Sequence, residues 1–318
     1  MTSVELAEAS NAAVYASMIT LTLAMIAFAA SFASGRRRPA TVGAHVAAEG
    51  QGSTAVLTRT DPPVVEQPGR RAANVGMSLT WLAFGLLLVG VVLRGVWAGR
   101  VPWGNMYEFS ITAALGVLGV FLGMSLRRDL RWLGLFVVIP TLLWLGLAVT
   151  VLYTEAAQLV PALKSYWLVI HVSAAIICFG AFTFAAATAA LALVRGRVER
   201  RQGAAVVTGW ASHLPSSERL ERLTQTVIAF SFPLWTFAIV AGAIWAENAW
   251  GRYWGWDPKE TWAFITWVIF AAYLHARSTA GWRGSRASWI AIAGWVAFLI
   301  NYFGVNIFVN SLHSYAGV

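Results

Sequence analysis

Five histidines and one densely aromatic segment are the parts of this sequence best suited to bind a ligand or a metal. The segment spans residues 250–262 and reads WGRYWGWDPKETW, so that four aromatic rings fall close together and are separated by glycines. Glycine allows a close approach to a flat partner, and aromatic rings stack on planar π-systems. The segment therefore predicts an aromatic shelf for haem, with a lipid headgroup platform or a protein docking surface as alternatives. We define this aromatic shelf as Trp250, Tyr253, Trp254, Trp256, Asp257 and Trp262.

The charged residues of the same segment allow two interpretations. Arg252 and Lys259 could bind carboxylates at the edge of a planar ligand, such as the propionates of haem. Asp257, Pro258 and Glu260 match the N-cap, N1 and N3 positions of a helix, and the first and last of them resemble a capping box. A helix is therefore expected to begin at Pro258, and this structural role alone could explain these three residues.

Two histidines lie near the ends of apolar runs, at the same expected membrane level as the aromatic shelf. His171 falls just inside the run 167–194, and His313 follows the run 287–309. Neutral imidazole is a good axial ligand for haem iron, so this pair could hold a six-coordinate haem. Ordinary hydrogen-bonded interfacial histidines are the alternative. If the last helix continues, Asn306, Asn310 and His313 share one face of it.

The other histidines are expected at the opposite membrane level. His275 lies 17 residues after Pro258, which is about 26 Å along a helix. It could ligate a second haem near the inner surface, or it could be an interfacial histidine among arginines. His45 and His213 fall in predicted inner loops and are expected to be solvated.

The elements that must position these residues are membrane spans. The chain has 318 residues, of which 58% are hydrophobic and only 12% charged, whereas soluble domains carry about 25% charged residues. A span needs about 20 apolar residues. We predict an all-α integral membrane protein, a bundle of about eight transmembrane helices. The runs are 13–33, 77–96, 109–126, 132–152, 167–194, 225–245, 258–276 and 287–309.

The basic residues predict the orientation of the bundle. Glu5 and Glu8 precede the first run, and an arginine triplet at 36–38 follows it, which places the N-terminus outside. Threading the chain from there puts most of the 23 lysines and arginines in inner loops and both termini outside. The net charge of +9 therefore indicates orientation in a lipid bilayer, and no nucleic-acid partner is expected.

Composition divides the chain into three parts. Residues 1–34 are expected to form an N-terminal transmembrane helix, and residues 35–76, rich in Gly, Pro, Thr and Ala, a flexible cytoplasmic linker. Residues 77–318 are expected to form a seven-helix core that carries the outer loop 250–262. No internal repeat is evident. The single cysteine, Cys178, excludes a C-x-x-C-H motif, so the chain is not itself a c-type cytochrome.

The segment from Trp250 to Trp262 resembles the tryptophan-rich "WWD" signature of haem-handling proteins. The continuation AFITW and then YLHAR is similar to the CcsA branch, also called ResC, of cytochrome c biogenesis system II, and less similar to CcmF or CcmC. The likeness is specific from about residue 235 onward. It extends more weakly to an outer loop that contains Pro102, Asn105, Tyr107 and Glu108.

The resemblance implies a role for each histidine near a membrane surface. His171 and His313 match the two outer histidines that ligate haem iron. His275 matches an inner, transmembrane haem ligand whose second ligand comes from a partner subunit, ResB or CcsB. The metal-binding residues implied in this way are His171, His275 and His313, all towards haem iron, and the substrate is haem b.

The implied activity is that of a cytochrome c haem lyase, or synthase, in the cytoplasmic membrane with its active site on the outer face. Each thiol of an apocytochrome C-x-x-C-H motif adds across a haem vinyl group, so that sulfur bonds to one carbon and hydrogen to the other. No side chain of this chain acts as the nucleophile, and catalysis is largely positioning. The implied partners are the ResB-type subunit, apocytochrome c and a thiol-reducing system.

Two other functions fit the same residues. A haem transporter or chaperone would deliver haem and leave ligation to another protein. A b-type membrane electron carrier would need a histidine pair at each haem level or a quinone site, and the sequence offers only one candidate pair, His171 and His313.

The charge pattern makes a prediction about topology. An alkaline phosphatase fused after Val318 should be active, because that end is expected outside the cytoplasm, where the phosphatase can fold. A cytoplasmic reporter at the same position should be silent, and activity from that reporter alone would overturn the topology.

Overall fold

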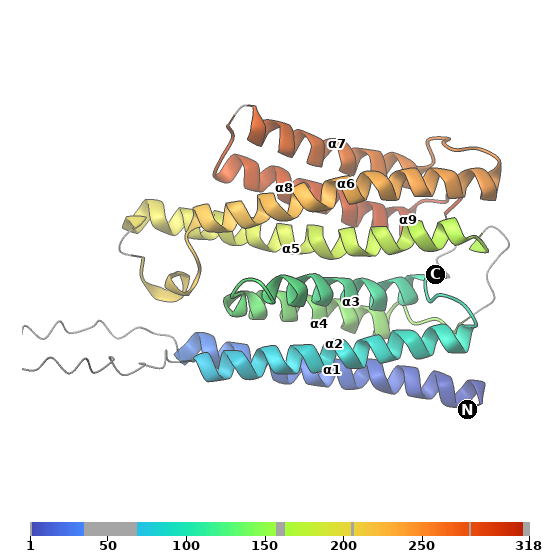
Figure 1. The fold of residues 1–318 in the computed structure, drawn as a ribbon, viewed down its shortest axis with the longest axis horizontal. Helices are drawn as coiled ribbons and strands as arrows, with labels where there is room; N and C mark the ends of the chain where they lie inside the picture. The colour runs from blue at the N-terminus through green and yellow to red at the C-terminus, as the bar shows by residue number, and fades with distance from the viewer. Residues whose placement is uncertain (1, 35–68, 157–162, 205–206, 280, 314–318) are drawn as a thin grey trace, which may run out of the picture.

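A computed structural model describes residues 2–34, 69–156, 163–204, 207–279 and 281–313. Within these residues the chain forms eight long helices that lie side by side along one axis (Figure 1). The last of them continues through a π-helical turn, Ile300–Gly304, into α9, Val305–Phe308. The eight long helices are α1 (Ser3–Ser34), α2 (Arg70–Ala98), α3 (Met106–Ser125), α4 (Gly134–Thr150), α5 (Tyr166–Gln202), α6 (Ser217–Trp250), α7 (Pro258–Ser278) and α8 (Ser285–Leu299).

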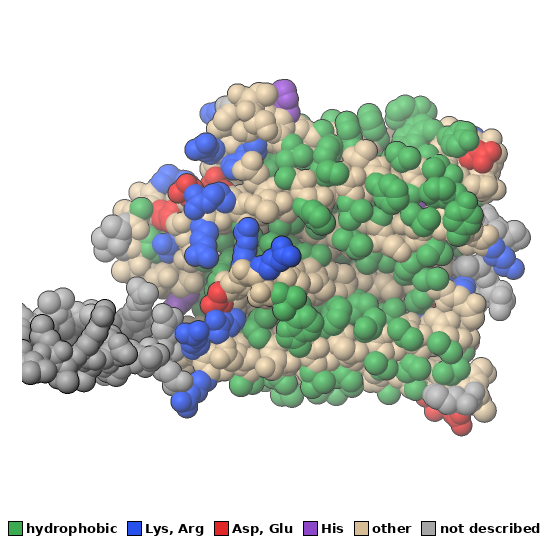
Figure 2. Space-filling model, viewed as in Figure 1, with side chains coloured by type: hydrophobic (Ala, Val, Ile, Leu, Met, Phe, Trp, Pro, Cys, Tyr) green, Lys and Arg blue, Asp and Glu red, His purple; other side chains and the backbone are tan. Residues whose placement is uncertain are grey.

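The helices have the length and composition of membrane spans, which confirms an all-helical, multi-pass membrane protein. In the described part of the chain, seven of them are long and apolar enough to cross a bilayer. The remaining helix, α7, is less apolar because its first turn carries Lys259 and Glu260 and its last turn His275 and Arg277. Hydrophobic side chains cover the middle of the molecule, and lysines and arginines gather at one end (Figure 2).

The loop end carries the connection between α6 and α7, and the basic end is the opposite one, where lysines and arginines gather. The beginning of α1 and the end of α9 both lie at the loop end (Figure 1).

The second helix begins earlier than the sequence predicts. We expected a linker through residue 76, but α2 starts at Arg70, while residues 35–68, which include His45, lie outside the described residues. A search for apolar runs misses this first stretch because it contains two arginines and an asparagine. It is helical because it packs on α1: Ala73 is buried, and a Cβ on Gly76 would lie 2.9 Å from the ring of Phe28.

The first helix is part of the bundle. The hydroxyl of Ser10 donates to the carbonyl of Gly90 at 2.8 Å, and Ser17 donates to the carbonyl of Ala83 at 2.8 Å. Small residues with interhelical hydrogen bonds are the usual contacts between helices in lipid. Helix α1 is therefore held along much of its length by α2.

Helices α3 and α5 cross at the centre of the bundle. A Cβ on Gly180 would lie 2.5 Å from the carbonyl oxygen of Gly116, so the two backbones are in direct contact at this crossing. The crossing holds the loop-end halves of both helices close together. Phe109 of α3 and His171 of α5 consequently line one space at the loop end.

Candidate functional site: a histidine-lined aromatic cavity

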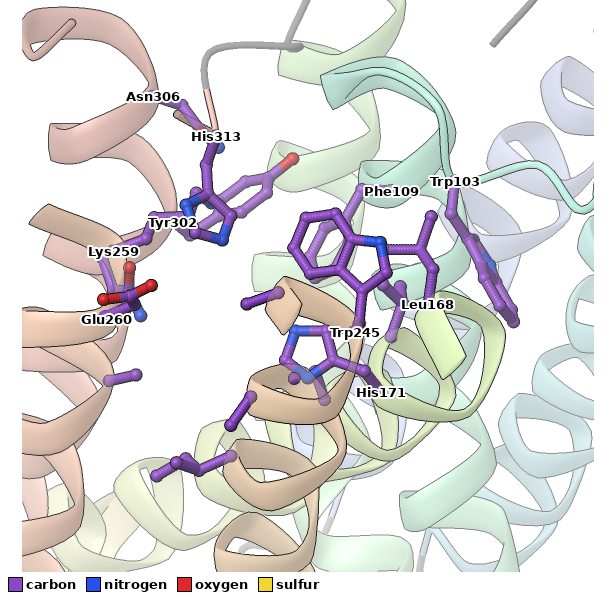
Figure 3. A pocket seen from close by; sticks show the side chains of 18 of the residues that line it. Trp103, Phe109, Leu168, His171, Trp245, Lys259, Glu260, Tyr302, Asn306 and His313 are labelled. Atoms are coloured by element: carbon purple, nitrogen blue, oxygen red, sulfur yellow. The ribbon is translucent and has the colours of Figure 1, made fainter. Parts of the chain in front are cut away.

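A cavity opens at the loop end between α3, α5, α6, α7 and α8. It encloses about 1250 Å³ including its open mouth. His171 and His313 both line it, together with Lys259. Figure 3 shows Lys259 and Glu260 on one side of this space and Trp103 and Leu168 on the other. The rings of Phe109 and Tyr302 stack on each other, with 4.7 Å between their centroids. Its aromatic lining is Trp103, Phe109, Trp235, Trp245, Tyr253, Trp254, Phe298 and Tyr302.

His171 is held in one tautomer by the neighbouring helix. Its Nδ1 lies 2.7 Å from the carbonyl oxygen of Ala238 in α6. A carbonyl only accepts hydrogen bonds, so Nδ1 carries a proton, and in the neutral ring Nε2 keeps its lone pair. The close approach of the His171 ring to α6 requires glycine at position 242, because a Cβ there would lie 2.7 Å from Nδ1 of His171. The pairing of α5 with α6 therefore presents a neutral imidazole as a donor ligand.

His313 is held in the same tautomer by a carboxylate. Its Nδ1 lies 2.7 Å from Oδ2 of Asp257, while the amide of Leu312 donates to Oδ1 at 3.0 Å. Burial, and then the positive charge of Lys259, lower the pKa of His313 to about 4. The ring is therefore neutral near pH 7, with its proton on Nδ1 and a lone pair on Nε2. A carboxylate behind a histidine is a common arrangement at metal sites.

Asp257 performs two tasks with one carboxylate. It caps α7 by accepting from the amide of Lys259, and Glu260 completes the capping box by accepting from the Asp257 amide at 3.0 Å. The expected helix start at Pro258 is thus confirmed. Burial alone would raise the pKa of Asp257, but the Leu312 amide and the His313 ring outweigh it and hold that pKa below its usual value.

The C-terminal segment reaches the cavity by a turn. A continuing helix would have placed Asn306, Asn310 and His313 on one face, but α9 ends at Phe308, close to the expected end of the apolar run at residue 309. Asn306 lines the cavity and Asn310 is exposed. His313 faces the cavity because the segment after α9 packs back against the start of α7, through Asp257.

Trp245 is a central residue that the sequence analysis did not single out. It is 2% exposed, and its ring lies parallel to His171 at 6.4 Å between centroids. The same ring lies 5.5 Å from His313 and 4.7 Å from Trp250. Its place near the end of an apolar run made it look like an ordinary interfacial tryptophan. The sequence signal that could have identified Trp245 is its position only five residues before Trp250, the first residue of the aromatic segment.

The residues of the aromatic shelf differ in whether they line the cavity. Tyr253 and Trp254 line the cavity, and Trp250 packs edge-on against His313 at 4.8 Å. Trp256 is 64% exposed and packs against Trp254 and Phe264, so it lies behind the lining. Its φ of 59° is unusual for a residue with a side chain. Trp262 also lies outside the lining.

The two candidate cations of the loop differ in the same way. The guanidinium of Arg252 is 3.2 Å from Glu260, and Arg252 does not line the cavity. Lys259 does line it, and its Nζ lies 6.0 Å from the ring centre of Tyr302. Among the described residues, no carboxylate lies within ion-pair distance of Lys259. It is therefore the cation available to an anionic group in the cavity.

The remaining histidines lie elsewhere. His275 is exposed in the last turn of α7, far from the cavity, as its position in the sequence predicted. His213 ends a short 3₁₀ helix, Gly209–His213, and packs on Phe32 with 5.1 Å between ring centroids. In the described part of the chain, no three His, Cys, Asp or Glu side chains converge as they would for a bare metal ion.

Comparisons with known proteins place the chain in a family. Residues 103–313 match the family model described as cytochrome C assembly protein. The chain is 36% identical to the cytochrome c biogenesis protein CcsA of Guillardia theta, over 76% of this chain and 85% of that one. It is 34% identical to CcsA of Microcystis aeruginosa, over 76% of this chain and 87% of that one.

A solved structure shares the fold. The cytochrome c haem lyase CcmF superposes with a TM-score of 0.59 at 15% identity, over 95% of this chain but 47% of that one, so this chain spans about half of that protein. At this identity the likeness concerns the fold alone. The family match and the CcsA relatives, which cover most of the chain, show that it belongs to the CcsA family of cytochrome c assembly proteins and has a role in cytochrome c biogenesis.

Proposed function

We propose that this chain is the haem-handling subunit of a system II cytochrome c synthase. It would bind haem b in the cavity at the loop end, which we take to be the outer face of the cytoplasmic membrane, and present it for thioether attachment to apocytochrome c. The observation that carries the proposal is that His171 and His313 each present an unprotonated Nε2, held by a hydrogen bond at Nδ1, to one aromatic cavity.

The donor set suits haem better than a bare metal ion. Haem brings four equatorial nitrogens of its own and needs one or two axial ligands from the protein, which His171 and His313 can supply. Aromatic walls suit a planar macrocycle. Lys259, without a carboxylate partner among the described residues, suits a propionate, whereas Arg252 is already paired with Glu260.

The chain's own residues would act by positioning. His171 and His313 would fix the iron, and Asp257 would keep His313 in the ligating tautomer. Cys178 is buried in α5, and its thiol contacts the carbonyl of Ser231. It does not line the cavity, so the attacking thiols would belong to the apocytochrome.

Partners would complete the pathway. His275, exposed at the basic end, would ligate haem on the inner side with a second ligand from a ResB or CcsB type subunit. A thiol-reducing system would keep the apocytochrome cysteines ready for attachment. The exposed position of His275 supports this arrangement, because a ligand that is completed by another subunit must be accessible to it.

The decisive experiment is an absorption spectrum of the protein purified with its partner, beside His171→Ala and His313→Ala. We expect a low-spin haem signal that each substitution abolishes and added imidazole restores, because the missing axial nitrogen is replaced. His275→Ala serves as a control for the inner position. A signal untouched by the first two substitutions would remove the proposed outer site. Intact binding without thioether formation would instead favour a haem chaperone.

Replacing Asp257 separates its two tasks. Asp257→Ala should cost about 1 kcal/mol of stability as a lost cap, and should also weaken haem retention by about 10–100-fold as a lost partner of a ligating histidine. Ser216→Ala is the matched control, because Ser216 caps α6 without approaching the cavity. It should lose similar stability and retain haem. Equal haem retention in the two variants would restrict Asp257 to capping.

The lowered pKa of His313 predicts haem binding in mild acid. An unperturbed imidazole becomes protonated below about pH 6.5, but the buried ring of His313 should stay neutral down to its lowered pKa of about 4. The low-spin signal should therefore persist from pH 8 to about pH 5.5. A pH titration of the purified protein measures this, with a bis-imidazole haem complex in the same detergent as reference. Loss of the signal with a midpoint near pH 6.5 would contradict it.

A further inference from the structure

Two loops at the loop end are built on the same plan. Arg100 precedes Glu108 by eight residues, and Arg252 precedes Glu260 by eight residues. Each glutamate lies in the first turn of the helix that follows, α3 or α7, three residues after its N-cap. The N-caps are Asn105 and Asp257.

The contacts within the two loops also correspond. The arginine contacts the glutamate at 2.7 Å in the first loop and 3.2 Å in the second. In each loop the amide of a glycine donates to the same carboxylate, from Gly104 at 2.7 Å and from Gly255 at 2.8 Å.

A glycine packs closely against the arginine in both loops. A Cβ on Gly104 would lie 2.6 Å from the guanidinium of Arg100, and a Cβ on Gly255 would lie 1.8 Å from that of Arg252. Each glutamate thus holds its loop through an ion pair with the arginine and a hydrogen bond from the glycine amide, and the loop backbone packs against the arginine side chain.

The first loop is fastened more firmly. Glu108 is fully buried and also contacts Nε of Arg94 at 3.1 Å, and Arg94 is itself fully buried. Removing one partner of a buried ion pair leaves an uncompensated charge. Such a clamp fixes the residues between Arg100 and Glu108 in one conformation.

Both fastened loops end at the same cavity. Tyr253 and Trp254 of the second loop line it, and so do Trp103, Gly104 and Asn105 of the first. Trp103 lies on the side of the cavity away from Lys259 and Glu260 (Figure 3). Leu168 extends this wall, so its side chains are apolar, whereas the opposite side of the cavity carries Lys259 (Figure 3).

We propose that the loop 100–108 is the second half of the haem site, with Trp103 as a contact residue and Glu108 as the positioning residue that fastens it. This inference rests on the proposed function. The carboxylate edge of the macrocycle would face Lys259, and its hydrocarbon edge, which carries the vinyl groups, would lie against Trp103.

The test is a haem titration of the full-length protein in detergent, followed in the Soret band. Trp103→Ala should weaken binding about tenfold, because a buried aromatic contact is lost, and Trp103→Phe should restore most of it. Trp289→Ala is the matched control, because that side chain is 60% exposed on α8 and does not line the cavity. It should bind haem like the parent.

Glu108→Gln should weaken binding to a similar extent, and the remaining haem should keep its low-spin spectrum, because both histidines are intact. Added imidazole should not restore binding, in contrast to the histidine variants. If Glu108→Gln does not accumulate, the haem affinities of Trp103→Ala and Trp103→Phe decide whether the loop 100–108 contacts haem.

Two results separate the possible failures. Haem binding that is indifferent to His171 and His313 would overturn the proposed function as a whole. If haem binding depends on His171 and His313 but Trp103→Ala binds haem as tightly as the parent, only the proposed role of the loop 100–108 is overturned.

Discussion

The carboxylate of Asp257 is the contact on which the geometry of the cavity depends. It accepts from the first turn of α7, from the amide of Leu312 and from the ring of His313, so it joins two segments that are distant in sequence. Its bonds to Leu312 and His313 hold the segment after α9 against the start of α7. One carboxylate therefore sets the start of a helix and the tautomer of a candidate iron ligand.

Glutamates fasten the rest of the loop end in a similar way. In an apolar solvent every buried polar group needs a partner inside the protein, and buried charges need a counterion. Glu108 and Glu260 meet this requirement with arginines and with loop amides. Lys259 also lines the cavity, and among the described residues no carboxylate lies within ion-pair distance of it.

The length and packing of the helices determine how far apart the histidines at the two ends of the bundle lie. The close crossing of Gly116 and Gly180 brings α3 and α5 together, so that the walls of the cavity come from helices far apart in the chain. His275 lies in the last turn of α7, at the far end from the residues that begin it. The two histidine levels therefore follow from helix length, and a single helix carries residues of both.

The sequence by itself determined the local features. Eight apolar runs predicted eight helices, and Asp257, Pro258 and Glu260 predicted the start of α7, because hydropathy and helix capping depend on neighbouring residues. Tertiary structure decided the rest. It turned Trp256 away from the cavity, brought Trp245 close to both histidines and chose the nitrogen that each histidine presents. The placement of Trp245 and of both histidines depends on contacts between residues dozens of positions apart, which no local pattern encodes.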